Sequence, residues 1–186
     1  MLKLEIKYKI EDAENKKILI EKPSDSGVLN LVKAIHHLIT PKQFTNERFI
    51  TTSNAGFQWI NLELDYPYEN PPYNGICVGS SQIPYDINQY NLQALITHGT
   101  GSGQLQYGSN NVSFFIINET TATWTANKTF SNESGNTVNI NEIGIIHATG
   151  AEGGLIFLMI RDVLPSTIAL QNQKSIRIEY AFSLSV

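Results

Sequence analysis

The sequence predicts a mainly β fold, an antiparallel β-sandwich or jelly-roll-like domain with one short N-terminal helix. Apolar and charged residues alternate from Leu2 to Ile10, and short apolar segments alternate with turn residues from Leu105 to the C-terminus. One stretch, Val28–Ile39, instead has its apolar residues at helical spacing. A period of two places apolar side chains on one face of a strand. Short strands at regular intervals are typical of sandwiches and jelly rolls.

The N-terminal segment predicts a β-hairpin followed by the helix. Leu2–Ile10 is expected to form the first strand and Lys16–Glu21 the second, with turn residues between them. Residues 24–26 offer N-caps for the helix over Val28–Ile39, and Pro41 marks its end. We expect one domain, in which residues 1–45 form this hairpin and helix, a candidate assembly arm, and residues 46–186 form the sandwich body.

The rest of the chain predicts strands separated by turns. Leu155–Val163 is an almost unbroken apolar run, which indicates a strand buried on both faces, and Pro165 is expected to end it. The last strand alternates from Ile176 to Leu184. The other strands of the body are expected at Ile76–Val78, Val112–Asn118, Thr121–Ser131 and Val138–His147.

Composition argues against several classes of function. Charged residues are 16% of the chain, against about 25% in an average soluble protein. The net charge is −4 and basic residues form no cluster, so we expect no nucleic-acid binding, which requires several Lys or Arg on one face. No apolar run reaches the roughly 18 residues of a membrane span, and no membrane insertion is expected. Cys77 is the single cysteine and lies in an apolar strand, where a buried thiol is expected.

Residues that commonly carry chemistry are present, but they form no catalytic pattern. His36 and His37 are adjacent and point about 100° apart on a helix, so they do not chelate one ion. His98 precedes a Gly-rich loop that lacks the lysine of a phosphate-binding loop, and His147 ends a strand. No nucleophile elbow or zinc-binding motif occurs. We therefore expect neither an enzyme nor a bound metal or cofactor.

Aromatic residues gather near a proline-rich stretch, residues 65–75. Tyrosine and tryptophan suit surfaces that are partly apolar and partly polar. They serve a glycan site, a protein interface, or simply the attachment of the loop to the sheet, and the sequence leaves these alternatives open. The candidate interface or ligand residues are Trp59, Tyr66, Tyr68 and Tyr73.

Four segments occur in an order that resembles structural proteins of tailed phages. They are an apolar strand with a Gly and small-residue exit at Ile76–Pro84, a turn at Thr129–Val138, a strand at Asn141–Ile145 and a strand at Phe157–Pro165. The resemblance covers about residues 76–186. It implies a non-enzymatic structural protein that is made in the host cytoplasm and resides in the virion, in the tail, the neck or the capsid exterior.

The resemblance also implies partners. These are copies of the chain itself and other virion proteins, and the alternative of a glycan- or receptor-binding module at 65–75 adds a host-surface glycan. The strand Leu2–Ile10, with an open edge, and the helix Val28–Ile39 are the elements expected to make these contacts. The other interpretation is that both complete the sheet of their own subunit.

Two charged residues lie inside otherwise apolar strands of the same region. Glu142 interrupts one strand and Arg161 interrupts another. A buried charge requires a partner. We therefore predict that Glu142 and Arg161 form a structural ion pair across neighbouring strands and fix their register. A separation beyond about 6 Å would contradict this prediction.

Overall fold

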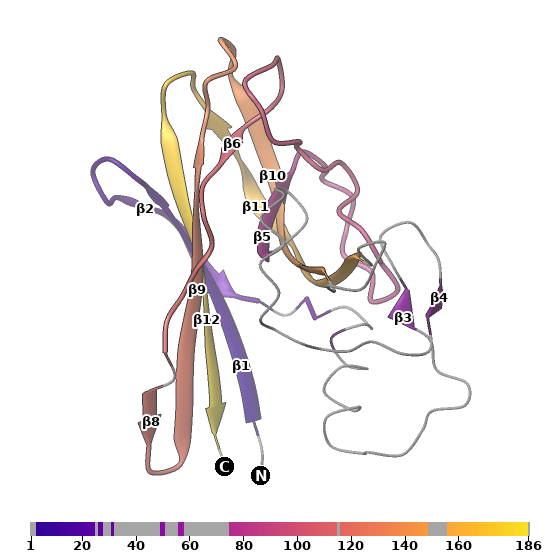
Figure 1. Ribbon diagram of the computed structural model, residues 1–186, viewed down its shortest axis with the longest axis vertical. Helices are drawn as coiled ribbons and strands as arrows, with labels where there is room; N and C mark the ends of the chain where they lie inside the picture. The colour runs from indigo at the N-terminus through magenta and orange to yellow at the C-terminus, as the bar shows by residue number, and fades with distance from the viewer. Residues whose placement is uncertain are drawn as a thin grey trace. The chain divides into compact units, whose positions relative to one another are not determined.

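The computed structural model describes residues 3–24, 26–27, 31, 49–50, 56–57, 75–114, 116–148 and 156–185. The described residues are mainly β with antiparallel pairing, which confirms the predicted class (Figure 1). Their elements include no helix, and the helix predicted at 28–39 lies outside the described residues except for Leu31. Among the described residues, no helix is long and apolar enough to cross a membrane.

The strands differ greatly in length. Five have ten residues or more and form most of the pairing: β1 (Lys3–Asp12), β9 (Thr121–Ser131), β10 (Val138–Ala148), β11 (Ile156–Leu170) and β12 (Ser175–Ser185). The shorter strands are β2 (Ile18–Pro23), β3 (Phe49–Ile50), β4 (Gly56–Phe57), β5 (Gly75–Gly79), β6 (Gln106–Tyr107), β7 (Asn111–Val112) and β8 (Ile116–Asn118).

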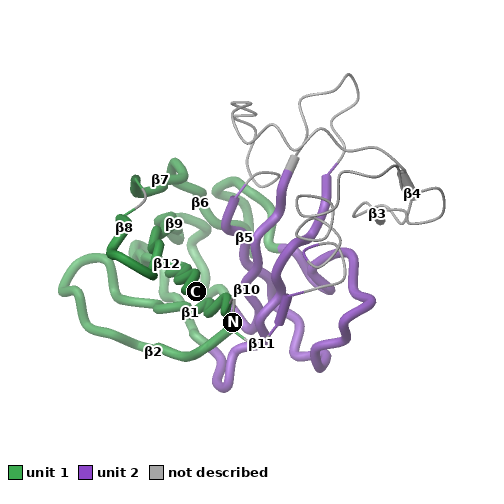
Figure 2. Tube along the Cα trace, turned by 90° about the horizontal axis from the view of Figure 1, so that it is seen from below, with its two compact units in different colours: residues 1–25, 96–139, 168–186 green, residues 26–95, 140–167 purple. Residues whose placement is uncertain are grey.

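The chain divides into two compact units (Figure 2). Unit 1 comprises residues 1–25, 96–139 and 168–186, and unit 2 comprises residues 26–95 and 140–167. The boundary falls inside β10 and β11, so each unit is assembled from segments that are distant in the sequence. The expected single domain, with an arm at 1–45 and a body at 46–186, stays a prediction.

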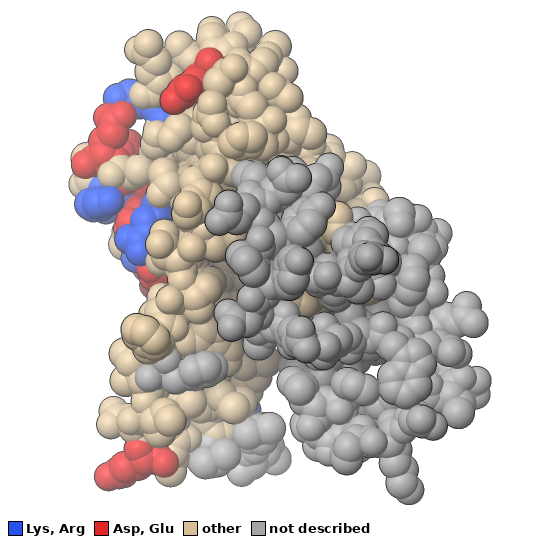
Figure 3. Space-filling view, viewed as in Figure 1, with Lys and Arg blue, Asp and Glu red and all other residues tan. Residues whose placement is uncertain are grey.

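Unit 1 contains a seven-stranded sheet in the order β2-β1-β12-β9-β6, in which β7 and β8 also pair with β9. The alternation of β1 and β12 produces this pairing, because apolar residues face apolar residues across the ladder. Tyr8 lies opposite Tyr180 and Ile10 opposite Ile178, and all four side chains are buried. The other face of the same strands carries the charged residues, which gather beside the β1–β2 hairpin (Figure 3).

The N-terminal strand was expected to have an open edge, and this is wrong for its second half, while its role in contacts with partners stays a prediction. β1 lies between β2 and β12, and its residues 7–11 pair with both, so this part of the strand forms its ladders within the subunit. The physical reason is the matching alternation at the two ends of the chain. β1 pairs with β12 along its whole length, from Lys3↔Ser185 to Asp12↔Ile176, and this pairing places Tyr8 and Ile10 in the core.

Unit 2 contains a three-stranded sheet in the order β11-β10-β5. Residues 157–162 of β11 and 76–79 of β5 are all buried, as expected of continuous apolar runs. β11 does not end at Pro165, as the sequence predicted, but continues to Leu170. Because β11 is at the edge of this sheet, the missing N–H of an exposed proline costs no ladder hydrogen bond on the outer side.

Candidate functional site

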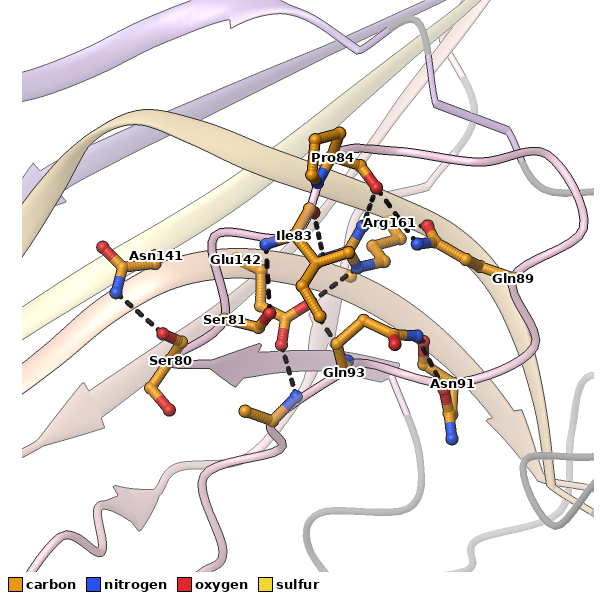
Figure 4. A network of polar contacts seen from close by, with 12 residues as sticks. Ser80, Ser81, Ile83, Pro84, Gln89, Asn91, Gln93, Asn141, Glu142 and Arg161 are labelled. Atoms are coloured by element: carbon orange, nitrogen blue, oxygen red, sulfur yellow. Dashed lines mark hydrogen bonds and ion pairs between the residues drawn. The ribbon is translucent and has the colours of Figure 1, made fainter.

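A buried ion pair joins two neighbouring strands of unit 2. Arg161 Nε of β11 donates to Glu142 Oε2 of β10 at 2.6 Å, and both side chains are 0% exposed (Figure 4). The structure thus brings together the two residues that the sequence singled out as a pair. Their proposed role in strand register stays a prediction.

The carboxylate of Glu142 also accepts two backbone hydrogen bonds. Gln93 N donates to Oε2 at 3.2 Å and Ala94 N donates to Oε1 at 2.8 Å. Both donors belong to the segment that follows residue 80, and not to a strand of the sheet. The buried negative charge is therefore shared between the arginine and the backbone of this segment, which is the environment that a buried carboxylate requires.

The guanidinium of Arg161 binds the same segment at its other end. Nη2 donates to the carbonyl oxygen of Ile83 at 2.8 Å. Nη1 donates to Gln89 Oε1 at 2.8 Å and to the carbonyl oxygen of Pro84 at 3.4 Å. The planar, multi-donor guanidinium suits such simultaneous contacts, whereas a lysine offers only a point charge. The ion pair thus contacts both the beginning and the end of one loop.

The loop comprises residues 80–94, and we call it the clamped loop. Its ends meet, because Ser80 N donates to the carbonyl oxygen of Ala94 at 2.8 Å. A closed loop of this kind is a compact surface feature with its own internal packing. Gly79, the last residue of β5, leaves room for the closure: a Cβ there would lie 2.7 Å from the Ala94 carbonyl oxygen and 2.7 Å from Glu142 Cγ.

A second, neutral set of hydrogen bonds holds the start of the clamped loop. Asn141 Nδ2 donates to the carbonyl oxygen of Ser80 at 2.8 Å. Asn141 Oδ1 accepts from Gln82 Nε2 at 3.2 Å and from Thr167 Oγ1 at 2.6 Å. Asn141 and Glu142 are consecutive residues of β10, so one strand anchors the loop with both of its faces.

The clamped loop presents apolar side chains to solvent. Ile83, Tyr85 and Ile87 are all exposed, although they are large and hydrophobic. The hydroxyl of Tyr85 donates to the carbonyl oxygen of Gly27 at 2.9 Å, which fixes this side chain as well. Partial burial raises the pKa of Tyr85, and the nearby charges of Asp86 and Asp162 raise it further, so the phenol remains a neutral donor. The clamped loop, held by these hydrogen bonds, thus presents three exposed apolar side chains.

The other residues that the sequence singled out lie elsewhere in the chain. Trp59, Tyr66, Tyr68 and Tyr73 lie outside the described residues, as do His36 and His37. His98 Nδ1 accepts from the backbone N–H of Tyr107 at 3.0 Å, and Cys77 is buried. In the part of the chain that the structure describes, no three His, Cys, Asp or Glu residues are grouped so as to hold a metal ion.

Sequence reasoning found the ion pair but missed the clamped loop. Residues 80–94 have no periodic pattern, and their conformation depends on partners in β10 and β11. The one available signal was the pair itself, because a buried charge that interrupts an apolar strand has to bind something polar nearby. Gly79 was a weaker signal, since glycine at the end of a strand often marks a close approach of the backbone.

No family model, curated protein or solved structure matches this chain.

Proposed function

We propose that the chain is a non-enzymatic structural protein of a phage particle, which assembles through protein contacts in the tail, the neck or the capsid exterior. Two lines support the proposal: the resemblance over residues 76–186, and the clamped loop, which lies inside that range. The fold that belongs to this proposal is the antiparallel sandwich or jelly-roll-like arrangement. The mainly β class and antiparallel sheets are compatible with it.

The clamped loop is the observation that carries the proposal. Catalytic charges are directed at the place where a substrate reacts. The charges of Arg161 and Glu142 are instead bound to each other and to the backbone of their own chain at Ile83, Gln93 and Ala94. Their attraction to each other and to the backbone therefore holds the clamped loop in its conformation. A rigid surface loses little conformational entropy when it binds, which favours assembly.

The composition of this surface suits a protein partner. Ile83, Tyr85 and Ile87 are exposed apolar side chains, and the exposed polar residues Gln82, Asp86 and Asn88 are next to them in the sequence. Apolar and aromatic residues with a polar rim are the usual anatomy of a protein interface. We therefore propose that the clamped loop contacts a neighbouring protein of the particle.

Incorporation into particles tests the proposal. Particles are purified from cells that carry the gene in its native genetic context, and the chain is quantified in them by mass spectrometry. We expect the wild-type chain to be present, and the double variant Ile83→Asp/Ile87→Asp to be at least tenfold depleted. Leu19→Asp is the matched control, because Leu19 is also an exposed apolar residue but lies in β2 of unit 1, and it should be incorporated normally.

Two results would count against the proposal. Absence of the wild-type chain from purified particles would refute the virion role. Normal incorporation of the double variant would be consistent with the virion role but would exclude the clamped loop as the surface that contacts the particle. Binding of the purified chain to a glycan array, with no incorporation into particles, would favour the receptor-binding alternative at 65–75.

A further inference from the structure

The two edges of the sheet in unit 1 have opposite chemistry. One edge is β2, which carries Glu21, Lys22 and Pro23 next to each other, all of them exposed. Charged residues and proline on an edge strand oppose pairing with another chain, because they place a charge or a missing N–H where a new strand would dock. This edge is therefore protected against association.

The other edge lacks this protection. It is formed by β7 and β8, which pair one after the other along β9, and within the described residues no strand pairs with their outer side. The neighbouring β6 is covered on that side, since Tyr107 N donates to His98 Nδ1 at 3.0 Å. Residues 99–118 include no Asp, Glu, Lys, Arg or Pro. Four large apolar side chains here are strongly exposed: Val112 at 68%, Phe114 at 93%, Ile116 at 66% and Ile117 at 76%.

An edge of this kind tends to pair with another strand when it is left open to water. Alternate N–H and C=O groups of an edge strand point away from the sheet and form a template for another strand. A short uncharged segment rich in β-branched and aromatic residues, without proline, is also the composition that pairs most readily. Contiguous exposed apolar residues mark interaction sites in folded proteins. The described residues of this segment, 111–114 and 116–118, meet these criteria.

We propose that this edge pairs with the same edge of a second copy of the chain, in an antiparallel arrangement. The charge distribution favours a second copy as the occupant. A two-fold axis places each edge opposite itself, so charges on the edge would meet like charges. The β7–β8 edge has none between Asn111 and Asn118, whereas the β2 edge has both Glu21 and Lys22.

The register of the sheet adds a second argument. Ile117 lies opposite Ala122 and Val112 opposite Ala126, so both are on the face of β9 that carries Trp124. Trp124 lies opposite Phe182, and their rings stack at 4.9 Å with an interplanar angle of 4°. Pairing of two edges would therefore continue one apolar face across both copies. This proposal rests on the proposed function in that it names one surface through which the particle protein would contact itself.

Light scattering of the purified chain over a range of concentrations tests the proposal. The wild-type chain should reach at least twice the monomer mass of 20.7 kDa. Ile117→Lys should raise the dissociation constant at least tenfold, because it places a like charge on each side of the two-fold axis. Ile18→Lys is the matched control: Ile18 is 52% exposed on the protected β2 edge, and its variant should associate as the wild type does.

A cross-linking experiment gives an independent measurement. Phe114→Cys should form a disulfide-linked dimer under mild oxidation, since the fully exposed position 114 lies near the centre of the paired segment. The only native cysteine, Cys77, is buried and should add little background. Leu19→Cys on β2 should remain uncross-linked.

Some results would overturn the edge proposal without touching the proposed function. A wild-type chain that stays monomeric at every concentration would do so, as would equal association of Ile117→Lys, or equal cross-linking of the Phe114→Cys and Leu19→Cys variants. Incorporation into particles is measured separately, so a chain that enters particles but does not self-associate would leave the virion role intact.

Discussion

The two units place the same kinds of charged residues in different surroundings. In unit 2, Arg161 and Glu142 are fully buried and 2.6 Å apart. In unit 1, Lys9 and Arg177 lie between Glu11 and Glu179 at 3.2 to 3.5 Å, and each cation keeps about a third of its side chain in water. Both sets cross neighbouring strands, β10 and β11 in one case and β1 and β12 in the other.

The difference teaches that burial, more than distance, decides what an ion pair does. Partly exposed pairs contribute about 0 to 1 kcal/mol, because water and salt screen them and competing hydration is always available. A buried pair contributes little net stability. The loss of one member nevertheless costs about 3 to 5 kcal/mol, because the remaining charge is then buried without a partner. In the cluster of unit 1 the two cations stay partly in water although Glu11 is buried, whereas the pair of unit 2 has no exposed member and binds a loop.

The largest expected effect follows from removing one buried partner. Arg161→Met should lower the free energy of unfolding by about 3 to 5 kcal/mol, because Glu142 then remains buried without its cation. Denaturant unfolding monitored by circular dichroism measures the change. The double variant Arg161→Met/Glu142→Leu should recover most of the loss. If the double variant were as unstable as the single one, the cost would come from packing and not from charge.

Crowding at Gly79 provides a smaller, uncharged way to disturb the same loop. Gly79→Ala would push a methyl group against the Ala94 carbonyl oxygen and Glu142 Cγ, so we expect a loss of about 1 to 3 kcal/mol. Ser80→Ala is the control next to it, because the Ser80 side chain is exposed and only its backbone holds the loop. Equal stability of the two variants would show that the closure at Gly79 is loose.

His147 extends the comparison to a buried polar atom of unit 2 without a partner among the described residues. Its Nε2 is buried and unbonded, and burial lowers the pKa of the imidazole below its ordinary value of about 6.5. The unfolded chain then binds the proton more readily than the folded chain. The free energy of unfolding should therefore be constant above the unfolded pKa of about 6.5 and should fall as the pH drops below it.

The variant His147→Gln should have a flatter stability profile than the wild type between about pH 7 and pH 5. Unfolding curves at a series of pH values measure the difference between the two proteins. Parallel profiles would mean that His147 titrates alike in the folded and unfolded chains.

The smallest expected effect belongs to the exposed cluster. Arg177→Met should cost no more than about 1 kcal/mol, because Arg177 is partly exposed and Lys9 remains 3.5 Å from both Glu11 and Glu179. The difference from the wild type should shrink further at high salt. Unfolding at low and high ionic strength checks this expectation. A loss as large as that of Arg161→Met would erase the distinction between the two clusters.

Local patterns predicted the elements, while contacts between distant segments decided the rest. The alternation of residues 2–10 was sufficient to predict β1, and the lone charges in apolar strands were sufficient to suggest the pair of Glu142 and Arg161. The partner of β1 could not be foreseen, because β12 lies at the opposite end of the chain. The clamped loop was missed for the same reason. Its conformation depends on contacts with β10 and β11, and residues 80–94 have no periodic pattern that predicts it.

Hydrogen exchange of the clamped loop tests the central claim most directly. The claim is that the buried ion pair holds residues 80–94 as a rigid contact surface. The Arg161→Met/Glu142→Leu variant keeps an apolar core and should keep the sheet of unit 2 protected. We predict that the amides of Gln93 and Ala94, which donate to Glu142 in the wild type, lose their protection in this variant while those of β5 retain it. Unchanged protection at Gln93 and Ala94 would contradict the account, because the loop would then be rigid without the pair.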